Sequence, residues 1–365
     1  MKFALPLYRE PDFSQEIYAK APDAQTKPVF RQGVAPEQYH ATTIFPEYFK
    51  LGGQWVPVTE SRMDCVVVVR DDGTPETKEM RRLAVGERVV IGRSEDGHEG
   101  IYLHANCFRS ARESGDVFSF RSGRSRETSY SRDYDLLYDL LRYEKEHGYI
   151  VWVLGPAVVF DSDSRRAMMA LIENGYVQAI LGGNALATHD LEGAIFQTAL
   201  GQDIYTQTSR PNGHYHHLDV INKARKYDSL KAFIETENIN DGIVSTCIKR
   251  QIPLVLAGSI RDDGPLPDVI GDVYQAQDAM RVHTRKATTM LGLATQLHSI
   301  ATGNMTPSYQ MVDGRIRPVY IYSVDVSEFA VNKLRDRGTL EVTSIVTNIQ
   351  DFLVNLGRNL VGSSR

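Results

Sequence analysis

The stretch that decides the fold is YIVWVLGPAVVFDSDSRRAMMALIENGYVQAILGG, residues 149–183. It opens with a continuous apolar run at 149–156, which is typical of a parallel strand buried on both faces. Residues 162–175 have helical spacing, begin at a Ser/Asp cap and stop at Gly175. A second apolar run follows at 177–181. A strand, a helix and a second strand in this order predict a βαβ unit with a right-handed crossover.

The same alternation continues towards the carboxyl end of the chain. We expect further strands at residues 252–258, 317–325 and 342–348, and helices at residues 136–148, 220–227, 241–251, 285–301 and 327–338. The predicted fold class is therefore α/β, with a Rossmann-like parallel sheet over residues 133–365.

The residues before this unit have a different texture. Short β-rich runs separated by glycine turns predict a small, mostly antiparallel β domain over residues 35–108. Residues 1–34 lack helical or strand periodicity and are expected to form an N-terminal arm. Residues 109–132 hold six Arg and seven Ser. They are expected to be a solvated linker, with an arginine-bearing loop over an anionic ligand as the alternative.

Composition excludes several classes of protein. The chain has 365 residues, is 42% hydrophobic and 24% charged, and carries a net charge of −5, so it is expected to be globular and not to bind nucleic acid. It holds no apolar stretch long enough to span a membrane, and its first residues do not resemble a secretory signal. Three isolated cysteines favour a reducing cytoplasm over a disulfide framework or a zinc cluster.

The expected strands end in small or polar residues, and ligands bind beyond the carboxyl ends of strands in such sheets. GGNALA, residues 182–187, offers glycines and a helix amino terminus to a phosphate, although it also fits a tight strand–helix turn. Asp325 ends a strand, as a ribose-binding carboxylate does, or caps the helix expected at Ser327. In ATGNMTPSY, residues 301–309, Gly303 fits a helix C-cap, while the neighbouring polar groups suit hydrogen bonds to a ligand.

Two other stretches carry candidate chemistry. RDDGPLP, residues 261–267, places two carboxylates directly after a buried strand, where one orients a ligand while the other transfers protons, unless Asp263 only forms an Asp–Gly turn. GHYHHLD, residues 213–219, is rich in histidine, but its spacing matches no metal motif, so we expect a polar active-site helix and no metal. Arg285 and Lys286 open the helix expected at 285–301, where they either meet a substrate carboxylate or lie on the helix surface.

Nine long stretches together resemble the archaeal-type ornithine cyclodeaminase family, also known as the lysine-oxoglutarate reductase/saccharopine dehydrogenase conserved region. They are GYIVWVLGPAVVFD, GGNALATHDLEGA, ALGQDIYTQ, PNGHYHHLDVIN, LAGSIRDDGPLPDVI, AQDAMR, RKATTMLGLATQLHSIATGNMTPSY, RPVYIYSVDVSEFAVNKLRDRG and IVTNIQDF. The same unit forms the carboxyl-terminal part of cyanobacterial bifunctional arginine dihydrolase/ornithine cyclodeaminases. The resemblance covers residues 35–355. It does not include their arginine-hydrolysing domain, so no arginine hydrolysis is expected.

The resemblance implies a Rossmann-like domain related to deoxyhypusine synthase, bound NAD and a homotetramer. It also implies that L-ornithine becomes L-proline and ammonia while NAD is recycled. For catalysis it favours Asp262, Asp263, Lys286, Arg261 and His189. For NAD binding it favours Asn184, Ala185, Asp263, Thr302, Gly303, Asn304, Met305, Asp325 and Asn348. A saccharopine-type amino-acid dehydrogenase and a non-catalytic NAD-binding module remain the alternatives.

Overall fold

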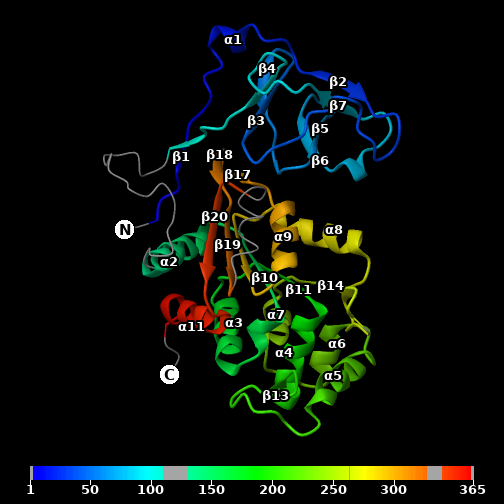
Figure 1. The fold of residues 1–365 in the computed structure, drawn as a ribbon, viewed down its shortest axis with the longest axis vertical. Coiled ribbons are helices and arrows are strands. Elements are labelled where there is room, and N and C mark those ends of the chain that lie inside the picture. The colour runs from blue at the N-terminus through cyan, green and yellow to red at the C-terminus, as the bar shows by residue number, and fades with distance from the viewer. Residues whose placement is uncertain (1–2, 110–129, 263, 327–338, 363–365) are drawn as a thin grey trace.

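The computed structural model describes residues 3–109, 130–262, 264–326 and 339–362. Figure 1 shows a β region, blue to cyan, at one end of the long axis and an α/β region that makes up the rest. The predicted linker at 109–132 and the predicted helix at 327–338 lie almost wholly or wholly outside the described residues. No helix among the described residues is long and apolar enough to cross a membrane.

The β region consists of antiparallel sheets, as expected. Four strands pair in the order β2-β7-β5-β6 and three in the order β4-β3-β8, while β1 pairs with β9. The elements are β1 Leu7–Tyr8, α1 Glu16–Ala19, β2 Gln25–Pro28, β3 Glu47–Leu51, β4 Gln54–Pro57, β5 Val66–Val69, β6 Pro75–Lys78, η1 Met80–Arg82, β7 Arg88–Ile91, β8 Ile101–Leu103 and β9 Phe108–Arg109. Phe49, Val58, Val67, Val90 and Ile101 form a fully buried core within it.

The expectation that residues 1–34 form an arm without strands was wrong. Residues 25–28 are strand β2, which pairs with β7 along its whole length. Lys50 Nζ binds the carbonyl oxygens that end α1, at 2.8 Å from Ala19 and 2.7 Å from Ala21. The strand escaped detection because it is a short, polar edge strand that ends on a proline, and such strands carry almost no apolar alternation.

The α/β region is built on a seven-stranded parallel sheet in the order β15-β14-β11-β10-β16-β19-β20. Its first part comprises α2 Tyr130–His147, β10 Ile150–Leu154, η2 Pro156–Val159, α3 Ser162–Glu173, β11 Ala179–Gly183, α4 Asn184–Phe196, β12 Thr198–Ala199, β13 Gln202–Asp203, η3 Gly213–Tyr215, α5 His216–Ala224, α6 Leu230–Thr236 and α7 Ile243–Arg250. Its second part comprises β14 Leu254–Ala257, β15 Val269–Ile270, α8 Val273–Thr284, β16 Thr289–Leu293, α9 Gln296–Met305, β17 Tyr309–Val312, β18 Arg315–Pro318, β19 Tyr320–Asp325, β20 Glu341–Val346 and α11 Ile349–Leu360.

Strand order along this sheet reverses between β10 and β16. From β10 the chain adds β11, β14 and β15 on one side, and then returns to add β16, β19 and β20 on the other. The helices follow this reversal, since α3 packs on one face of the sheet and α9 on the other. Such a reversal is the topological switch point at which doubly wound sheets bind ligands.

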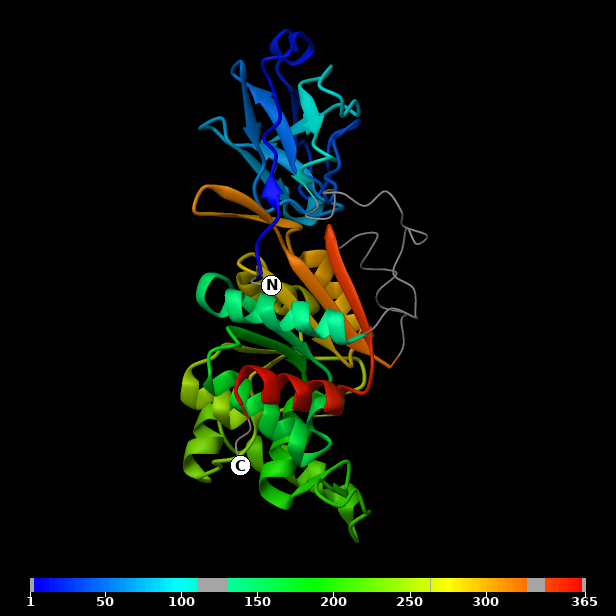
Figure 2. The ribbon, with the colours of Figure 1, turned by 90° about the vertical axis from the view of Figure 1, so that its left-hand side faces the viewer.

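Alternation along β10 explains why the sheet is covered on both faces. Ile150, Trp152 and Leu154 point into a core shared with α2, α3, α7 and α11. Val151 and Val153 point into the opposite core, which α8 and α9 close. All five side chains are buried, as the continuous apolar run predicts. Figure 2 shows α2, in teal, and α11, in red, one below the other on the same side of the molecule, both running across its long axis.

The helix predicted at 285–301 was wrong. Residues 289–293 form β16, an interior strand of the sheet between β10 and β19, and only residues 296–305 are helical, as α9. A five-residue apolar run cannot be told from a helix segment by periodicity alone. Gly292 marks the strand, because a Cβ there would lie 2.2 Å from the Ser299 hydroxyl oxygen of α9. The other five predicted strands are present as β10, β11, β14, β19 and β20.

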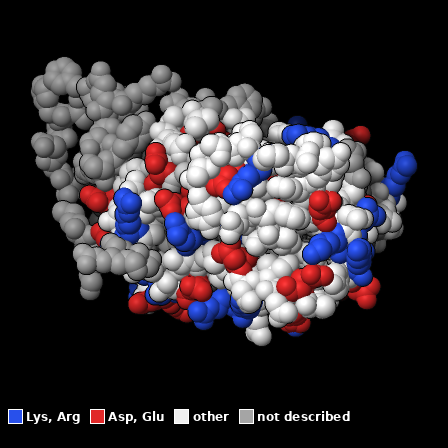
Figure 3. Space-filling model, turned by 90° about the horizontal axis from the view of Figure 1, so that it is seen from below, with Lys and Arg blue, Asp and Glu red and all other residues white. Residues whose placement is uncertain are grey.

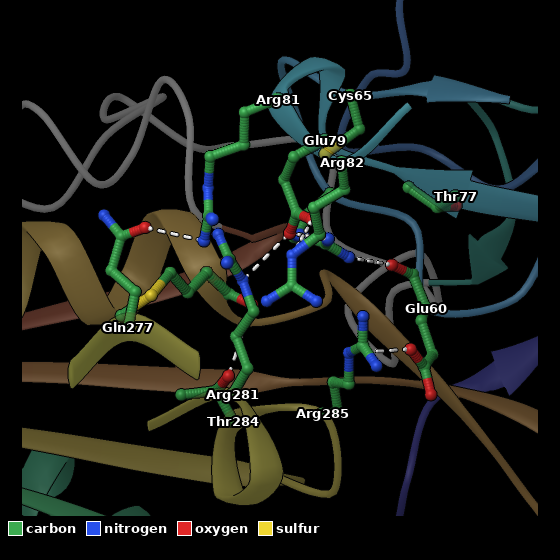
Figure 4. Close-up of polar contacts among 12 residues, drawn as sticks. Glu60, Cys65, Thr77, Glu79, Arg81, Arg82, Gln277, Arg281, Thr284 and Arg285 are labelled. Carbon is green, nitrogen blue, oxygen red and sulfur yellow. Dashed lines mark hydrogen bonds and ion pairs between the residues drawn. The ribbon is translucent and has the colours of Figure 1, made fainter. Parts of the chain in front are cut away.

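Salt bridges and hydrogen bonds join the two regions, as Figure 4 shows. Glu79 ion-pairs with Arg62 and Arg82 of the β region and with Arg281 of α8, whose Nε lies 2.8 Å from Glu79 Oε1. Burial raises the pKa of Glu79, but the charges of Arg62 and Arg281 outweigh it, so the pKa lies below its ordinary value. Glu79 therefore stays ionised and holds the seam together.

Candidate active site

Backbone hydrogen bonds join the residues at the carboxyl ends of β10, β16 and β19 across the switch point. The Gly155 N–H, just after β10, donates to the Leu293 carbonyl of β16 at 2.8 Å, and the Ala294 N–H donates to the Val324 carbonyl of β19 at 3.0 Å. A Cβ at Gly155 would lie 2.0 Å from the Ala294 carbonyl oxygen. Only glycine fits there, because the Ala294 carbonyl fills the place of a side chain, so the backbones that follow β10 and β16 pack directly against each other at the switch point.

The loop after β11 presents the amino terminus of α4 at the same edge. Gly183 is its N-cap, and no described side chain caps the helix there. Its first N–H groups thus remain available to a phosphate. Ala185 in the first turn is exposed. Asn184 is buried, and its Oδ1 accepts the Leu266 N–H at 3.0 Å. Asn184 therefore anchors the loop after β14 rather than offering this oxygen to a ligand.

The predicted acidic loop after β14 lies beside this helix. Asp262 Oδ2 accepts the Ser259 N–H at 2.8 Å, which folds the loop back on itself. Asp262 is partly buried and Arg261 is exposed. Asp263 lies outside the described residues. The loop thus brings one cation and one carboxylate to the carboxyl edge, but the carboxylate already has a structural bond.

Asp325 and Asn348 end the two neighbouring strands. Asp325 is the last residue of β19 and is partly buried, next in register to Ala294. This is the position that a ribose-binding carboxylate needs. Asn348 Oδ1 instead accepts the N–H groups of Gln350 at 2.8 Å and Asp351 at 3.2 Å. It is the N-cap of α11, so its side-chain oxygen has a structural role.

Two sets of predicted site residues do not lie at the carboxyl ends of the strands. Residues 302–305 occupy the last part of α9, and the Met305 carbonyl accepts a hydrogen bond from Thr284 at the end of α8. Lys286 does not open a helix; it follows α8, before the amino end of β16, and is exposed. Neighbouring Arg285 ion-pairs with Glu60 of the β region. The missed strand β16 therefore separates these residues from the carboxyl edge within one chain, and the ligand contacts predicted for them stay predictions.

Two other residues of the stretch 285–309 lie at the carboxyl end of β16, where the ligand contacts were expected. Thr295 and His298 stand at the start of α9, directly after β16. Burial lowers the pKa of His298 to about 4, so its imidazole is neutral at pH 7. His298 Nε2 is buried and has no hydrogen-bond partner among the described residues. A buried nitrogen of this kind is costly unless a ligand or water binds it.

Behind the first turns of α4 lies a second group of polar residues, which we call the α4 polar cluster: His189, Glu192, Thr198, His216 and His217. His189 Nδ1 lies 2.8 Å from Glu192 Oε2, and the Thr198 hydroxyl donates to Glu192 Oε1 at 2.8 Å. Burial lowers the pKa of His217, which keeps it neutral. The histidine-rich stretch is thus a polar helix start, as predicted, and it joins predicted His189.

Charges around this end of the molecule are mixed. Figure 3 views it from below, and basic and acidic side chains are interspersed over the face shown. Within the residues that the structure describes, no three His, Cys, Asp or Glu side chains gather in a way that would hold a metal ion. Asp190, next to His189, pairs with Arg165 at 3.1 Å and accepts the Val244 N–H, so it fixes α7 and not a ligand.

Family comparisons agree with this architecture. Residues 135–356 match the model of the "Arginine dihydrolase ArgZ-like, C-terminal, Rossmann fold" family, and residues 46–132 match its "first region". An ornithine cyclodeaminase of Methanocaldococcus jannaschii is 39% identical over 93% of this chain and 78% of its own length. One of Methanococcus maripaludis is 37% identical over 95% of this chain and 82% of its own length.

Solved structures show the same fold. A LOR/SDH protein from Methanococcus maripaludis superposes with a TM-score of 0.83 at 36% identity, over 93% of this chain and 98% of that one. The AgrE ternary complex with ornithine and NAD⁺ gives a TM-score of 0.59 at 34% identity, over 94% of this chain and 46% of that one. The chain therefore belongs to the ArgZ-like C-terminal family with a Rossmann fold, together with these archaeal ornithine cyclodeaminases.

Proposed function

We propose that the protein is an NAD-dependent ornithine cyclodeaminase, which converts L-ornithine to L-proline and ammonium. The observation that carries the proposal is the length of the similarity. Relatives named ornithine cyclodeaminase are 35–39% identical over more than nine-tenths of this chain, and AgrE has been solved with ornithine and NAD⁺. Substrate and cofactor are carried over from these relatives to this chain as part of the proposal.

The carboxyl edge of the sheet fits NAD. Gly183 leaves room for the backbone to approach a dinucleotide, since a Cβ there would meet only the Ala257 carbonyl oxygen at 3.7 Å, and the uncapped start of α4 suits a phosphate. Asp325 stands where a carboxylate binds ribose hydroxyls, and the buried Nε2 of His298 lacks a partner that a ligand would supply. We assign cofactor binding to these residues together with exposed Ala185. Asn184 contributes by holding the loop after β14.

When bound, NAD⁺ accepts a hydride from Cα of ornithine and returns it after ring closure, so that it is required but not consumed. The protein must therefore hold the substrate carboxylate, move protons at the two amino groups and keep water out. We assign the substrate carboxylate to Arg261, which is exposed in the loop after β14 at the carboxyl edge. We assign Asp262 and Asp263 to the attraction of the substrate ammonium groups, and His189 to proton transfer.

We also propose a homo-oligomer in the cytoplasm that serves proline synthesis. Large apolar side chains are exposed near the carboxyl edge, with Leu297 of α9 84% exposed and Ile260 fully so. Such side chains favour burial against another copy of the chain. The resemblance to the ornithine cyclodeaminase family implies that the oligomer is a tetramer. The three cysteines are unpaired and buried, which suits a reducing compartment.

The proposal is tested by incubating the protein with L-ornithine and a trace of NAD⁺ while absorbance at 340 nm and proline are followed together. We expect proline and ammonium in equal amounts, in excess over the cofactor, without accumulation of NADH. Stoichiometric NADH would indicate an amino-acid dehydrogenase instead. NAD binding without any product from ornithine would indicate a binding module.

A further inference from the structure

One face of α4 leads from the carboxyl edge into the α4 polar cluster. Ala185, His189 and Glu192 follow one another at spacings of four and three residues, so they share this face. His189 is the sixth residue of the helix, roughly 8 Å along it from Asn184. Its ring meets the ring of Phe160 edge-on at 6.0 Å, and Phe160 ends the short η2 turn that follows Gly155. His189 thus lies close behind the backbone of the switch point.

Glu192 is held more tightly than an ordinary helix glutamate. Its side chain is completely buried and accepts four hydrogen bonds. They come from His189, the Thr198 hydroxyl at 2.8 Å, and the N–H groups of Leu200 at 3.1 Å and Gly201 at 3.0 Å. Burial raises the pKa of Glu192, but these hydrogen bonds outweigh it and bring the pKa below its ordinary value. Glu192 is therefore an ionised carboxylate with fixed orientation.

An ionised carboxylate at this place decides which nitrogen of His189 carries the proton. Because a carboxylate only accepts, Nδ1 must donate, at 2.8 Å. In the neutral imidazole Nε2 then carries the lone pair, and the hydrogen bond of His189 to a described side chain is made by Nδ1 alone. His189 is only 7% exposed. A histidine with one nitrogen held by a buried carboxylate and the other free has the arrangement of a general base.

The other charged and titratable groups around His189 do not compete for this role. His217, on α5, lies with its ring 5.9 Å from His189, and burial keeps it neutral. His216 Nδ1 donates to Thr198, because the single hydroxyl proton of Thr198 is already given to Glu192. His214 in η3 is exposed. Glu192 is thus the described carboxylate residue that pairs with His189, while the neighbouring Asp190 pairs with Arg165.

We propose that His189 is the proton carrier of the reaction and that Glu192 is the positioning residue that keeps its Nε2 unprotonated and aimed at the substrate. This inference rests on the proposed function. Nε2 takes a proton from the α-ammonium of ornithine, which frees the nitrogen lone pair that stabilises loss of the Cα hydride to NAD⁺. The δ-amine, which has to reach the site in its neutral form, bonds to Cα and passes one proton to the α-nitrogen, whose C–N bond then breaks to release ammonia. The hydride returns to Cα, and the ring nitrogen takes up the proton that His189 holds. Atoms and charge then balance as ornithine with a neutral δ-amine giving proline zwitterion and ammonia, which takes a proton from solvent after release.

This assignment separates His189 from Asp262, the other described candidate. The Asp262 carboxylate is bound to the Ser259 N–H of its own loop and is partly exposed. Among the described residues, this backbone N–H is the one hydrogen-bond partner of the carboxylate, and no side chain orients it for proton transfer. Asp262 suits the attraction of a substrate ammonium, while the His189–Glu192 pair suits the transfer itself.

The test uses the full-length protein with NAD bound and three variants, H189Q, E192Q and E235Q. Glu235 on α6 is exposed and serves as the matched control. In protein labelled with ¹⁵N-histidine, we expect the spectrum of wild type to contain a histidine, absent from H189Q, whose Nδ1 is protonated and Nε2 is not. E192Q should lose this fixed tautomer, and E235Q should keep it.

Kinetics supply the second readout. We expect H189Q to lower kcat by about 10²–10⁴-fold with unchanged NAD affinity, since positioned proton transfer contributes by that factor. E192Q should lower kcat by a smaller factor, and the acid side of its kcat–pH profile should move to lower pH, because the charge that favours the imidazolium is gone. A residue that only supports folding would lower the melting temperature without moving the profile.

The outcomes separate this inference from the proposed function. If wild type makes proline but the E192Q profile does not move, or if His189 carries its proton on Nε2, the inference is wrong and the function stands. If wild type makes no proline, the function is wrong, and the tautomer spectrum alone then decides whether Glu192 positions His189. A fall in NAD affinity equal to the fall in kcat for H189Q would also overturn the inference.

Discussion

The backbone of Gly155 and that of Ala294 approach so closely that no side chain fits between them. A Cβ at Gly155 would lie 2.0 Å from the Ala294 carbonyl oxygen, while the Gly155 N–H bonds the neighbouring Leu293 carbonyl at 2.8 Å. These residues follow β10 and β16, the two strands between which the strand order reverses. The contact therefore defines the edge at which we place NAD.

The first prediction concerns this contact. Gly155→Ala should lower the free energy of unfolding by about 1–3 kcal/mol, because an added methyl group forces the backbone to shift. It should also weaken NAD binding, since the shift displaces the start of α9. Gly271→Ala is the matched control, because a Cβ there meets no atom within 4 Å. Urea unfolding and NAD titration measure both effects, and equal behaviour of the two variants would contradict the prediction.

The second prediction concerns Asp325. Asp325→Asn should weaken NAD binding by about 1.5–3 kcal/mol, the usual loss when a charge-assisted hydrogen bond is removed. Asp313→Asn, on the exposed turn between β17 and β18, should leave the affinity unchanged. Isothermal titration with NAD⁺ makes the comparison. Unaltered affinity in a folded Asp325→Asn protein would remove Asp325 from the cofactor site.

The third prediction concerns pH and the seam between the regions. The pKa of Glu79 is lowered in the folded protein, so its contribution is fully present above the ordinary carboxyl pKa and is lost as pH falls through the lowered value. Glu79→Gln should cost about 3–5 kcal/mol at pH 7, because it leaves buried guanidinium groups without their partner. Wild type should lose this advantage on acidification.

The control for this prediction is Glu16→Gln, since Glu16 forms only an exposed pair with Lys20. Urea unfolding between about pH 7 and pH 3 follows the difference between the variants. If the stability difference between wild type and Glu79→Gln were the same at every pH, Glu79 would not be titrating as the seam requires.

The fourth prediction concerns metal ions. Proline formation should survive exhaustive treatment with EDTA, since the described part of the chain brings no three metal-ligating side chains together. Activity is measured before and after chelation, with and without added Zn²⁺. Loss of activity that zinc alone restores would contradict this and would point back to His214, His216 and His217.

Much of the fold could be predicted because its signals are local. The run at 149–156 is apolar throughout, and β10 has to be so because helices cover both faces of the sheet. The sequence TMLGL could not be assigned in the same way. Its neighbours on both sides are compatible with a helix, and its pairing with β10 and β19, which the sequence does not reveal, makes it a strand. Because that strand was missed, Lys286 and residues 302–305 were expected in one helix that begins at 285.

The candidate site was predictable where it follows a strand and hidden where it depends on a distant partner. Asp325 and the start of α4 were found from strand ends alone. Asn184 and Asn348 were also predicted, but the side-chain oxygen of each accepts a hydrogen bond from a backbone N–H group. Sequence spacing does not reveal such a bond. His298 gave no signal until β16 was known. Glu192 was hidden for another reason, since its role depends on Thr198 and on the loop that follows it.

The most direct test of the central claim is the fate of the Cα hydrogen of ornithine. The protein is incubated with L-ornithine carrying deuterium at Cα and a trace of unlabelled NAD⁺, and the proline formed is examined by mass spectrometry and proton NMR. A redox-neutral cyclodeaminase predicts proline that keeps much of the deuterium at Cα, because the hydride returns to the carbon it left. Proline without deuterium at Cα, accumulation of NADH in step with ornithine consumed, or no proline at all would contradict the account.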